Sequence, residues 1–426
     1  MRVMRRLALA AAVGAALLLA PAASASSNAR MGIQDDAWLM WGPGTLSQRL
    51  STLRGLGVRT VRFTLRWDMV AARRPAHPLD PNDPAYAWGP FDAVLDSLHT
   101  RGITPVVTLW GAPKWSNGGH APSWLPRSGF GDFAYAAAKR YPWVRLWTIW
   151  NEPNTRVFSV PVSPKLYVHR LLNPAYVLLH RAARGNAVAG GVTSPRHTAS
   201  GMAPLDFMTG MHAFHARLDA YAANPYPSSP RLETPFSDPC RQCSTLTMAR
   251  LPEIRRDVSR LFGARTPLWL TEYGYQTSPP DRILGVPFAL QARYVGEAAL
   301  RVWEQPGTTM LIHFLVRDEP TSGGWQSGLF TAHGSPKPSS HAFALPLAEE
   351  SRHGSRVVLW GQVRPGSGRR AYDIQRWTGT RWVNVGGVKR TGVGGTFRTA
   401  VTTRPHTKVR LKARGVAFTS PPLVVE

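Results

Sequence analysis

The feature that most constrains this chain is a regular alternation of apolar strand-like segments with segments of helical periodicity. Eight apolar segments end near Asp35, Arg66, Trp110, Trp150, Thr193, Tyr226, Glu272 and Leu315. Successive ends are separated by about 30 to 46 residues, which leaves room for a strand, a helix and loops in each unit. Because no Gly-rich phosphate-binding motif follows the first strand, a doubly wound nucleotide-binding sheet is disfavoured. The pattern predicts an α/β fold with a (β/α)8 barrel over residues 30–347.

Helical periodicity of apolar residues fills the intervals between the expected strands. The expected helices are Leu46–Leu56, Phe91–Arg101, Phe130–Arg140, Leu166–Arg184, Leu251–Phe262 and Phe288–Glu304.

Two of the expected strands end in a carboxylate. Val144–Trp150 runs into the turn Asn-Glu-Pro-Asn, which contains Glu152, and Pro-Leu-Trp-Leu-Thr precedes Glu272. Both segments are largely apolar, as expected of parallel strands covered by helices. The carboxyl ends of such strands meet at one rim of a barrel, where the catalytic groups of barrel enzymes lie. An isolated Glu in a turn is usually a solvated residue, but two in the same setting predict a catalytic pair.

The two motifs, Trp-Asn-Glu-Pro-Asn and Leu-Thr-Glu-Tyr-Gly, together resemble the catalytic strands of clan A retaining glycoside hydrolases, the group of cellulase-like and β-xylosidase-like barrels. The resemblance covers roughly residues 32–345. It implies that Glu152, after strand four, is the acid/base and that Glu272, on strand seven, is the nucleophile. It implies no metal and no cofactor.

The same resemblance implies roles for three polar residues. Arg62, within the apolar segment Thr-Val-Arg-Phe-Thr, needs an anionic partner and matches the strand-two Arg that contacts the nucleophile. An Arg on the outer face of the barrel is the alternative, since Arg59 and Arg66 lie nearby. Asn151 matches the Asn that binds a sugar 2-hydroxyl, and Tyr226 matches the Tyr that orients the nucleophile.

Aromatic residues are the candidates for stacking on sugar rings. Trp110, Trp115 and Trp124 lie in and after the third expected strand, so we expect them to form a stacking platform. The chain departs from the resemblance at the eighth strand, where many members have a Trp. Here the segment offers His313, Phe314 and Arg317 instead.

The first residues are expected to be a signal peptide, residues 1–25. A basic stretch, Met-Arg-Val-Met-Arg-Arg, precedes an apolar run too short to span a bilayer comfortably, and Ala-Ser-Ala at positions 23–25 is typical of a cleavage site. We therefore expect a secreted protein with no membrane association after cleavage.

The formal net charge of +26 does not by itself predict a nucleic-acid partner. Most of the basic residues are arginines spread singly or in short pairs, whereas nucleic-acid binders usually gather them on one face. We expect a monomer without a nucleic-acid partner, with attraction to an anionic cell-wall polymer as a further possibility.

Cys240 and Cys243 are the only cysteines. In a cytosolic protein a Cys-x-x-Cys pair can be a redox motif or half of a zinc site. With an export signal and no second pair, a local disulfide is the better prediction. The histidines show no metal-ligand spacing.

After Leu347 the pattern changes to short alternating strands separated by Gly and Thr turns. Residues 356–426 are therefore predicted to be a small all-β accessory domain, similar to immunoglobulin-like sandwiches, after a polar connector at Glu349–Ser355. Trp377 and Trp382 are expected in its core, with a carbohydrate-binding role as the alternative.

These observations predict a secreted retaining glycoside hydrolase that cleaves β-glycosidic bonds in a poly- or oligosaccharide. The first alternative is an inactive barrel that binds carbohydrate or cell wall. A basic protein that binds cell wall or nucleic acid is the second.

Overall fold

The computed structural model describes residues 26, 29–196, 201–240, 243–321 and 323–426. The predicted signal peptide lies outside the described residues. Within the described part of the chain, no helix is long and apolar enough to cross a membrane.

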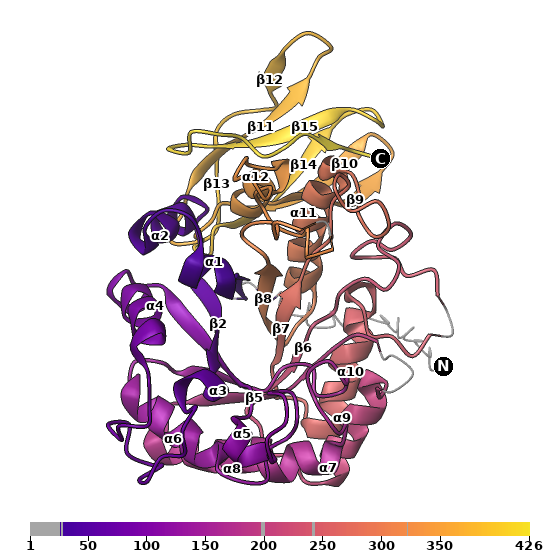
Figure 1. Ribbon diagram of the computed structural model, residues 1–426. Helices are drawn as coiled ribbons and strands as arrows, with labels where there is room; N and C mark the ends of the chain where they lie inside the picture. Colours follow the sequence, from indigo (N-terminus) through magenta and orange to yellow (C-terminus); the bar gives the residue numbers. More distant parts are fainter. Residues whose placement is uncertain (1–25, 27–28, 197–200, 241–242, 322) are drawn as a thin grey trace, which may run out of the picture.

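Eight parallel strands close into a barrel, which confirms the main fold prediction (Figure 1). Each strand pairs with the next in sequence, and β8 pairs with β1. The strands are β1 (Arg30–Gln34), β2 (Thr60–Arg66), β3 (Thr104–Trp110), β4 (Leu146–Ile149), β5 (Ala187–Thr193), β6 (Ala220–Ala223), β7 (Leu268–Tyr273) and β8 (Thr308–Phe314). Because parallel strands in order share one direction, all eight carboxyl ends meet at the same rim.

Helices surround the barrel and cover its outer face (Figure 1). The main helices are α2 (Leu46–Gly55), α4 (Gly89–Thr100), α6 (Phe130–Arg140), α8 (Asn173–Ala182), α9 (Pro204–Ala213), α10 (Leu251–Phe262) and α11 (Phe288–Glu304). Shorter ones are α1 (Asp36–Trp41), α3 (Trp67–Val70), α5 (Lys114–Asn117), α7 (Pro164–Tyr167) and α12 (Pro338–Ala344), with a π-helix at Val168–Leu172 and a 3₁₀-helix at Met248–Arg250. Of the predicted helices, Phe130–Arg140, Leu251–Phe262 and Phe288–Glu304 have the predicted bounds, while α9 was not predicted.

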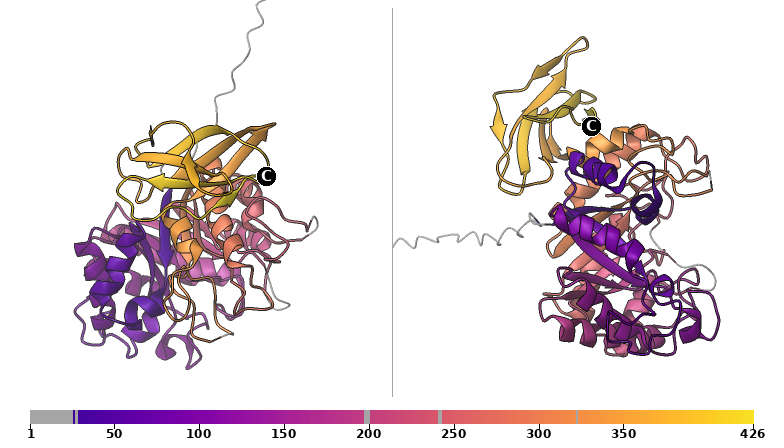
Figure 2. Two further views of the ribbon diagram at one scale, coloured as in Figure 1. Left: turned by 90° about the horizontal axis from the view of Figure 1, so that it is seen from above. Right: turned by 60° about the vertical axis from the view of Figure 1, so that its left-hand side comes forward.

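The C-terminal part forms two antiparallel sheets, placed at one side of the barrel in Figure 2. The inner sheet has the order β14-β10-β9, and the outer sheet has β12-β11-β15-β16 with β13 beside β11. The strands are β9 (Leu347–His353), β10 (Arg356–Gln362), β11 (Ala371–Trp377), β12 (Trp382–Asn384), β13 (Lys389–Arg390), β14 (Thr396–Thr402), β15 (Lys408–Ala413) and β16 (Leu423–Val424). Apolar side chains of both sheets form one core, in which Tyr372 stacks on Phe397 at 3.9 Å between ring centroids. Whether the arrangement is immunoglobulin-like stays a prediction.

The connector expected at Glu349–Ser355 is instead mostly strand β9, which begins at Leu347 and pairs with β10. Its charged side chains look like those of a linker, but β9 is an edge strand, where such residues are tolerated and protect against unwanted pairing. Glu349 and Glu350 are bound by arginines within the antiparallel part, Arg352 and Arg398 respectively.

Trp377 and Trp382 also differ from expectation, because neither belongs to the core between the two sheets. They lie opposite each other on β11 and β12 and are half-buried on the other face of the outer sheet. The core of the two sheets is instead built from aliphatic side chains together with Tyr372 and Phe397.

The inner sheet is packed against the barrel through α11. Ala299 and Leu300 of this helix share an apolar cluster with Ala348 of β9 and Trp360 of β10, and all four are almost completely buried. Gly296 lies so close to Leu347 that a Cβ atom would approach its carbonyl oxygen to 2.6 Å. The barrel and the inner sheet thus share a continuous buried surface.

We predict that Trp360→Ala destabilises the whole chain by about 3–5 kcal/mol, because it leaves a cavity between α11 and the inner sheet. Thermal denaturation should show one transition at a lower temperature. Trp382→Ala, in the half-buried position on the outer sheet, is the matched control and should have a much smaller effect. If Trp360→Ala instead gives two separate transitions with an unchanged barrel, the two parts are energetically independent.

Candidate active site

The turn after β4 has an unusual backbone that aims the Glu152 side chain. Trp150 and Glu152 adopt φ angles of 68° and 38°, in the left-handed region that L-residues rarely occupy. The Glu152 N–H donates to the carbonyl of Val192, and Thr155 donates to the carbonyl of Glu152. Asn154 is fully buried and holds the turn against the end of β5 by bonds to and from Ser194. Neighbouring strand ends therefore fix this strained turn.

Arg62 is completely buried inside the barrel, so the outer-face alternative is wrong. Its guanidinium forms an ion pair with Glu272 and donates to Gln34 (2.6 Å), Thr108 (2.9 Å) and Asn151 (2.9 Å). These partners come from β1, β3, the turn after β4 and β7. A single cation on β2 thereby links three other strands or strand ends to the carboxylate of Glu272 on β7.

Glu272 receives a second hydrogen bond, from the phenolic hydroxyl of Tyr226 at 3.1 Å. Burial raises the pKa of Tyr226 well above its ordinary value, and the nearby negative charge of Glu272 adds to the shift. Tyr226 is therefore a neutral donor to the carboxylate. With Arg62 on one oxygen and Tyr226 on the other, Glu272 is held in a fixed orientation.

Glu152 has different surroundings. Within the described residues, its carboxyl group receives a single hydrogen bond, from the side-chain amide of Asn224 at 3.1 Å. Thr271 donates to the oxygen of that amide at 2.8 Å. Burial raises the pKa of Glu152 to about 7, and the negative charge of Glu272 contributes to this rise. The site thus separates the two carboxyl groups: one has a buried arginine as its partner, and the other retains its proton up to neutral pH.

Both carboxyl groups line one cavity of about 390 Å³ at the rim of the barrel. This volume is typical of a site for a small ligand. Its walls combine the polar cluster with aromatic and basic side chains; they include Gln34, Asp36, Met40, Trp41, Arg66, Met69, Trp110, Asn151, Phe158, Arg196, Tyr226, Phe314 and Trp325. The structure therefore brings Glu152, Glu272, Arg62, Asn151, Tyr226 and Trp110 into one place.

The predicted platform of three tryptophans is wrong for two of its members. Trp110 lines the cavity, and the guanidinium of Arg66 lies over its indole, 4.6 Å from the ring centroid of Trp110. Trp115 instead packs edge-on against Trp67 and donates to the carbonyl of Ala71. Trp124 stacks on His120 at 3.9 Å and does not line the cavity. Trp115 lies in α5 and Trp124 on the segment that follows it, and this connection after β3 carries both away from the cavity.

Two tryptophans that the sequence analysis did not select supply aromatic walls. Trp41 ends the short helix after β1 and is 67% exposed, while Trp325 lies on the loop after β8. Trp325 packs against Tyr226 and, edge-on, against Phe314. Of the residues offered by the eighth strand, only Phe314 lines this cavity, and Trp325 places an indole beside it.

His313 and Arg317 point elsewhere. His313 is buried beside Ser327, and burial lowers its pKa to about 3. The guanidinium of Arg317 is bound to the carbonyl of Ala332. Neither residue lines the cavity.

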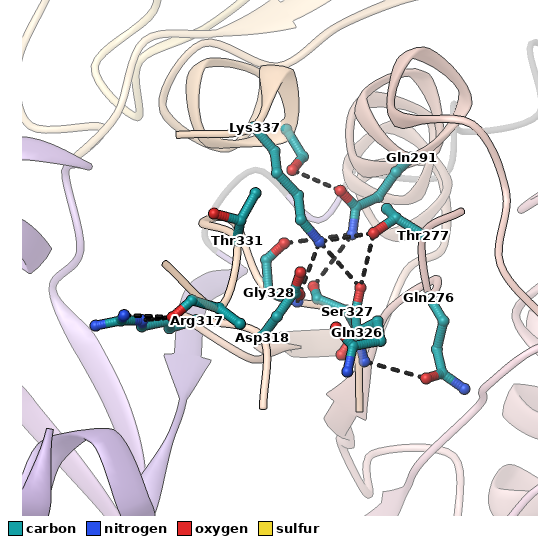
Figure 3. Close-up of polar contacts among 12 residues, drawn as sticks. Gln276, Thr277, Gln291, Arg317, Asp318, Gln326, Ser327, Gly328, Thr331 and Lys337 are labelled. Carbon is teal, nitrogen blue, oxygen red and sulfur yellow. Dashed lines mark hydrogen bonds and ion pairs between the residues drawn. The ribbon is translucent and has the colours of Figure 1, made fainter. Parts of the chain in front are cut away.

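A buried ion pair holds the loop that carries Trp325 (Figure 3). The ammonium group of Lys337 lies 2.7 Å from Asp318 and donates to Thr277 (2.8 Å) and to the carbonyl of Gln326 (3.0 Å). Burial lowers the pKa of Lys337, and the charge of Asp318 works against that shift. Because Gln326 directly follows Trp325, this network fixes the position of the indole in the cavity wall.

Cys240 and Cys243 are joined by a disulfide in the long loop between β6 and α10. Arg250 binds the carbonyls of both cysteines and forms an ion pair with Asp238 at 2.8 Å. The disulfide and this arginine shape the loop, and neither cysteine lines the cavity. In the described part of the chain, no three His, Cys, Asp or Glu side chains are grouped as metal ligands would be.

We predict that Glu152→Gln raises the melting temperature more at pH 8 than at pH 5. A carboxyl group whose pKa rises from about 4.3 in the unfolded chain to about 7 in the folded protein binds more protons when folded, so stability falls as the pH rises between these values. Glutamine removes this loss. Glu253→Gln, at a half-exposed site on α10, is the control, and an equal response of both variants would contradict the assignment.

We also predict that Lys337→Met destabilises the protein by about 3–5 kcal/mol, because Asp318 is left buried without a counter-ion. Chemical denaturation measures this loss. Adding Asp318→Asn should restore part of the stability, since the uncompensated charge is removed. If the free energy of unfolding of Lys337→Met lay within about 1 kcal/mol of the wild-type value, the pair would behave like a solvent-exposed salt bridge, which contradicts its burial.

No family model matches the chain, and no curated protein matches it. Solved structures do match. A family 39 glycoside hydrolase from Bacteroides cellulosilyticus WH2 has a TM-score of 0.57 at 16% identity, over 88% of this chain and 80% of that one. A GH5_18 protein from Streptomyces cattleya has a TM-score of 0.50 at 16% identity, over 74% and 79%. One from Bifidobacterium longum subsp. infantis has 0.50 at 15%, over 74% and 77%.

These similarities are between folds. They confirm that the resemblance to clan A glycoside hydrolases extends to a closed barrel of eight parallel strands.

Proposed function

We propose that this chain is a retaining glycoside hydrolase that cleaves β-glycosidic bonds in a poly- or oligosaccharide. The observation that carries the proposal is the unequal pair of carboxyl groups in one cavity. Glu272 is paired with the buried Arg62, whereas the pKa of Glu152 is raised to about 7. A double displacement needs this combination of an ionised nucleophile and a protonated acid.

In the first step Glu272 attacks the anomeric carbon of the bound sugar. Arg62 and Tyr226 orient its carboxylate before the reaction, so little reorganisation is needed. Glu152 donates its proton to the oxygen of the departing sugar or alcohol. The products of this step are the free leaving group and a covalent glycosyl-enzyme on Glu272.

In the second step Glu152 changes from acid to base, because the charge of Glu272 has changed. Formation of the ester removes the negative charge of Glu272, and with it one cause of the raised pKa of Glu152. Glu152, ionised after the first step, accepts a proton from a water molecule as that water attacks the anomeric carbon. The bond to Glu272 breaks and its carboxylate is released, and this second inversion gives net retention of configuration.

Asn151 is positioned to bind the sugar. Its oxygen accepts a hydrogen bond from Arg62, which turns the amide nitrogen away from the guanidinium. No acceptor for that nitrogen is found among the described residues, and Asn151 lines the cavity. We assign it to a sugar hydroxyl, with Trp325 as a stacking face, since the guanidinium of Arg66 lies over the ring of Trp110. Secretion, a monomeric state and the absence of a cofactor remain parts of the same proposal.

The test is chemical rescue with an activated aryl β-glycoside, after a screen of such glycosides identifies one that the wild type cleaves. Glu272→Ala removes the attacking atom, so kcat should fall by more than about 10³-fold. Azide should restore activity and give a glycosyl azide of inverted configuration. Cleavage by Glu272→Ala at nearly the wild-type rate would overturn the mechanism.

Glu152→Ala serves as the companion variant. Substrates with poor leaving groups need the proton and should lose about 10²–10⁴-fold, whereas the first step on activated ones should be spared. Azide should here give a product of retained configuration, formed from the glycosyl-enzyme. If Glu272→Ala instead gave the retained azide product and Glu152→Ala the inverted one, Glu152 would be the nucleophile and Glu272 the acid/base.

A further inference from the structure

We propose that the outer face of the sheet formed by β12, β11 and β15 binds an acidic polysaccharide. The alternation of side chains along these strands defines this face. On β11, Tyr372 and Ile374 enter the core, so Asp373, Gln375 and Trp377 lie on the other side. On β15, Val409 and Leu411 enter the core. The opposite side of β15 carries Lys408, Arg410 and Lys412.

This face is separate from the barrel. The inner sheet lies between it and α11, because Trp360 and Ala348 of the inner sheet pack on that helix. Figure 2 shows the outer sheet on the side of the accessory part that is turned away from the barrel. The proposed surface therefore does not depend on the cavity or on catalysis.

Two indoles form its aromatic part. Trp377 and Trp382 are directly opposite each other on adjacent strands, with ring centroids 5.4 Å apart, and both are half-buried. The guanidinium of Arg410 lies over the ring of Trp382, 4.2 Å from its centroid, so it fixes that indole and covers one of its faces. The other face of Trp382 and the ring of Trp377 are the parts left for a ligand. Indole faces held near solvent in this way offer apolar area for stacking against sugar rings at low entropic cost.

Two amide side chains lie in line with the indoles. Arg410 donates to Gln375 at 2.8 Å, and Gln375 donates in turn to Asn384 at 3.0 Å. Asn384 is exposed, and its amide nitrogen has no acceptor among the described residues. A pre-oriented amide beside an aromatic ring can hydrogen-bond sugar hydroxyls without first losing side-chain freedom.

The charge of the face indicates an acidic ligand. Lys408, Arg410 and Lys412 alternate along β15, so their Cα atoms are about 7 Å apart. Among the outward residues of these strands, the one carboxylate is Asp373, and Arg414 neutralises it at 3.3 Å. Lys408 and Lys412 are exposed and have no anionic partner in the described part of the chain.

The shape favours a polysaccharide over a nucleic acid. Single-stranded nucleic acids are usually bound in a basic groove that follows the phosphates, and arginines bind phosphate through free, paired donors. Here the surface is the face of a sheet, and the guanidinium of its central arginine donates to Gln375 through Nε and lies over the ring of Trp382. Indoles, amides and separated lysines suit rings that carry hydroxyls and carboxylates.

Binding of the full-length protein to polygalacturonate and to highly methyl-esterified pectin tests the proposal, since the two polymers share a backbone and differ in charge. We expect the wild type to bind the acidic polymer, with affinity falling as salt is added. Trp382→Ala and the double variant Lys408→Gln/Lys412→Gln should each bind about tenfold more weakly, equivalent to the loss of one stacking contact or of two exposed charge contacts.

The matched control is Lys139→Gln/Lys165→Gln, which removes the same charge from exposed sites on α6 and α7. This variant should bind like the wild type, and all variants should keep their cleavage of a small aryl glycoside. Equal losses in the control, or no binding by the wild type, would overturn the proposal. Tighter binding of single-stranded DNA that depends on the same residues would replace it with a nucleic-acid surface.

Discussion

The ion pair between Arg62 and Glu272 is the interaction on which the rest of the site depends. Removing two charges from water is costly unless every remaining donor and acceptor is satisfied. The barrel meets that requirement by surrounding Arg62 with Gln34, Thr108 and Asn151, each from a different strand or strand end. The same contacts that make the buried charge tolerable therefore also fix the distances between strand ends. Glu152 is buried beside a carboxylate whose place is already determined. Burial raises the pKa of Glu152, and the charge of Glu272 adds to the rise.

The sequence predicted the parts of the fold that repeat. The strands that precede Glu152 and end near Glu272 could be recognised because a buried barrel strand is a short run of apolar residues. The carboxyl ends of all such strands lie at the same rim of the barrel. Helix α9 was missed because Pro204–Ala213 contains Gly210 and two methionines and shows little periodicity. Strand β9 was missed because its charged edge residues look like a linker, and only pairing with β10 identifies it as a strand.

The walls of the cavity were harder to predict than its catalytic pair. Trp41 and Trp325 follow strand ends on segments without a repeating pattern, so nothing in the sequence separates them from Trp115 or Trp124. Their positions depend on contacts between distant segments. Trp325 is placed by Lys337, Asp318 and Thr277, which belong to three different loops or helix ends. Such a network can be read only from the folded structure.

The catalytic carboxyl groups are held by one shared hydrogen-bond network, whereas the aromatic walls of the cavity lie on separate segments. This difference affects how the cavity can change over evolutionary time. Trp41, Phe158 and Trp325 are carried by segments after β1, β4 and β8, and the segment after β8 has its own anchor in Lys337. A substitution or insertion in one of these segments can alter one wall while the Arg62 network remains intact. Ligand preference can therefore change through one loop at a time, while the fold and the ion pair between Arg62 and Glu272 are kept.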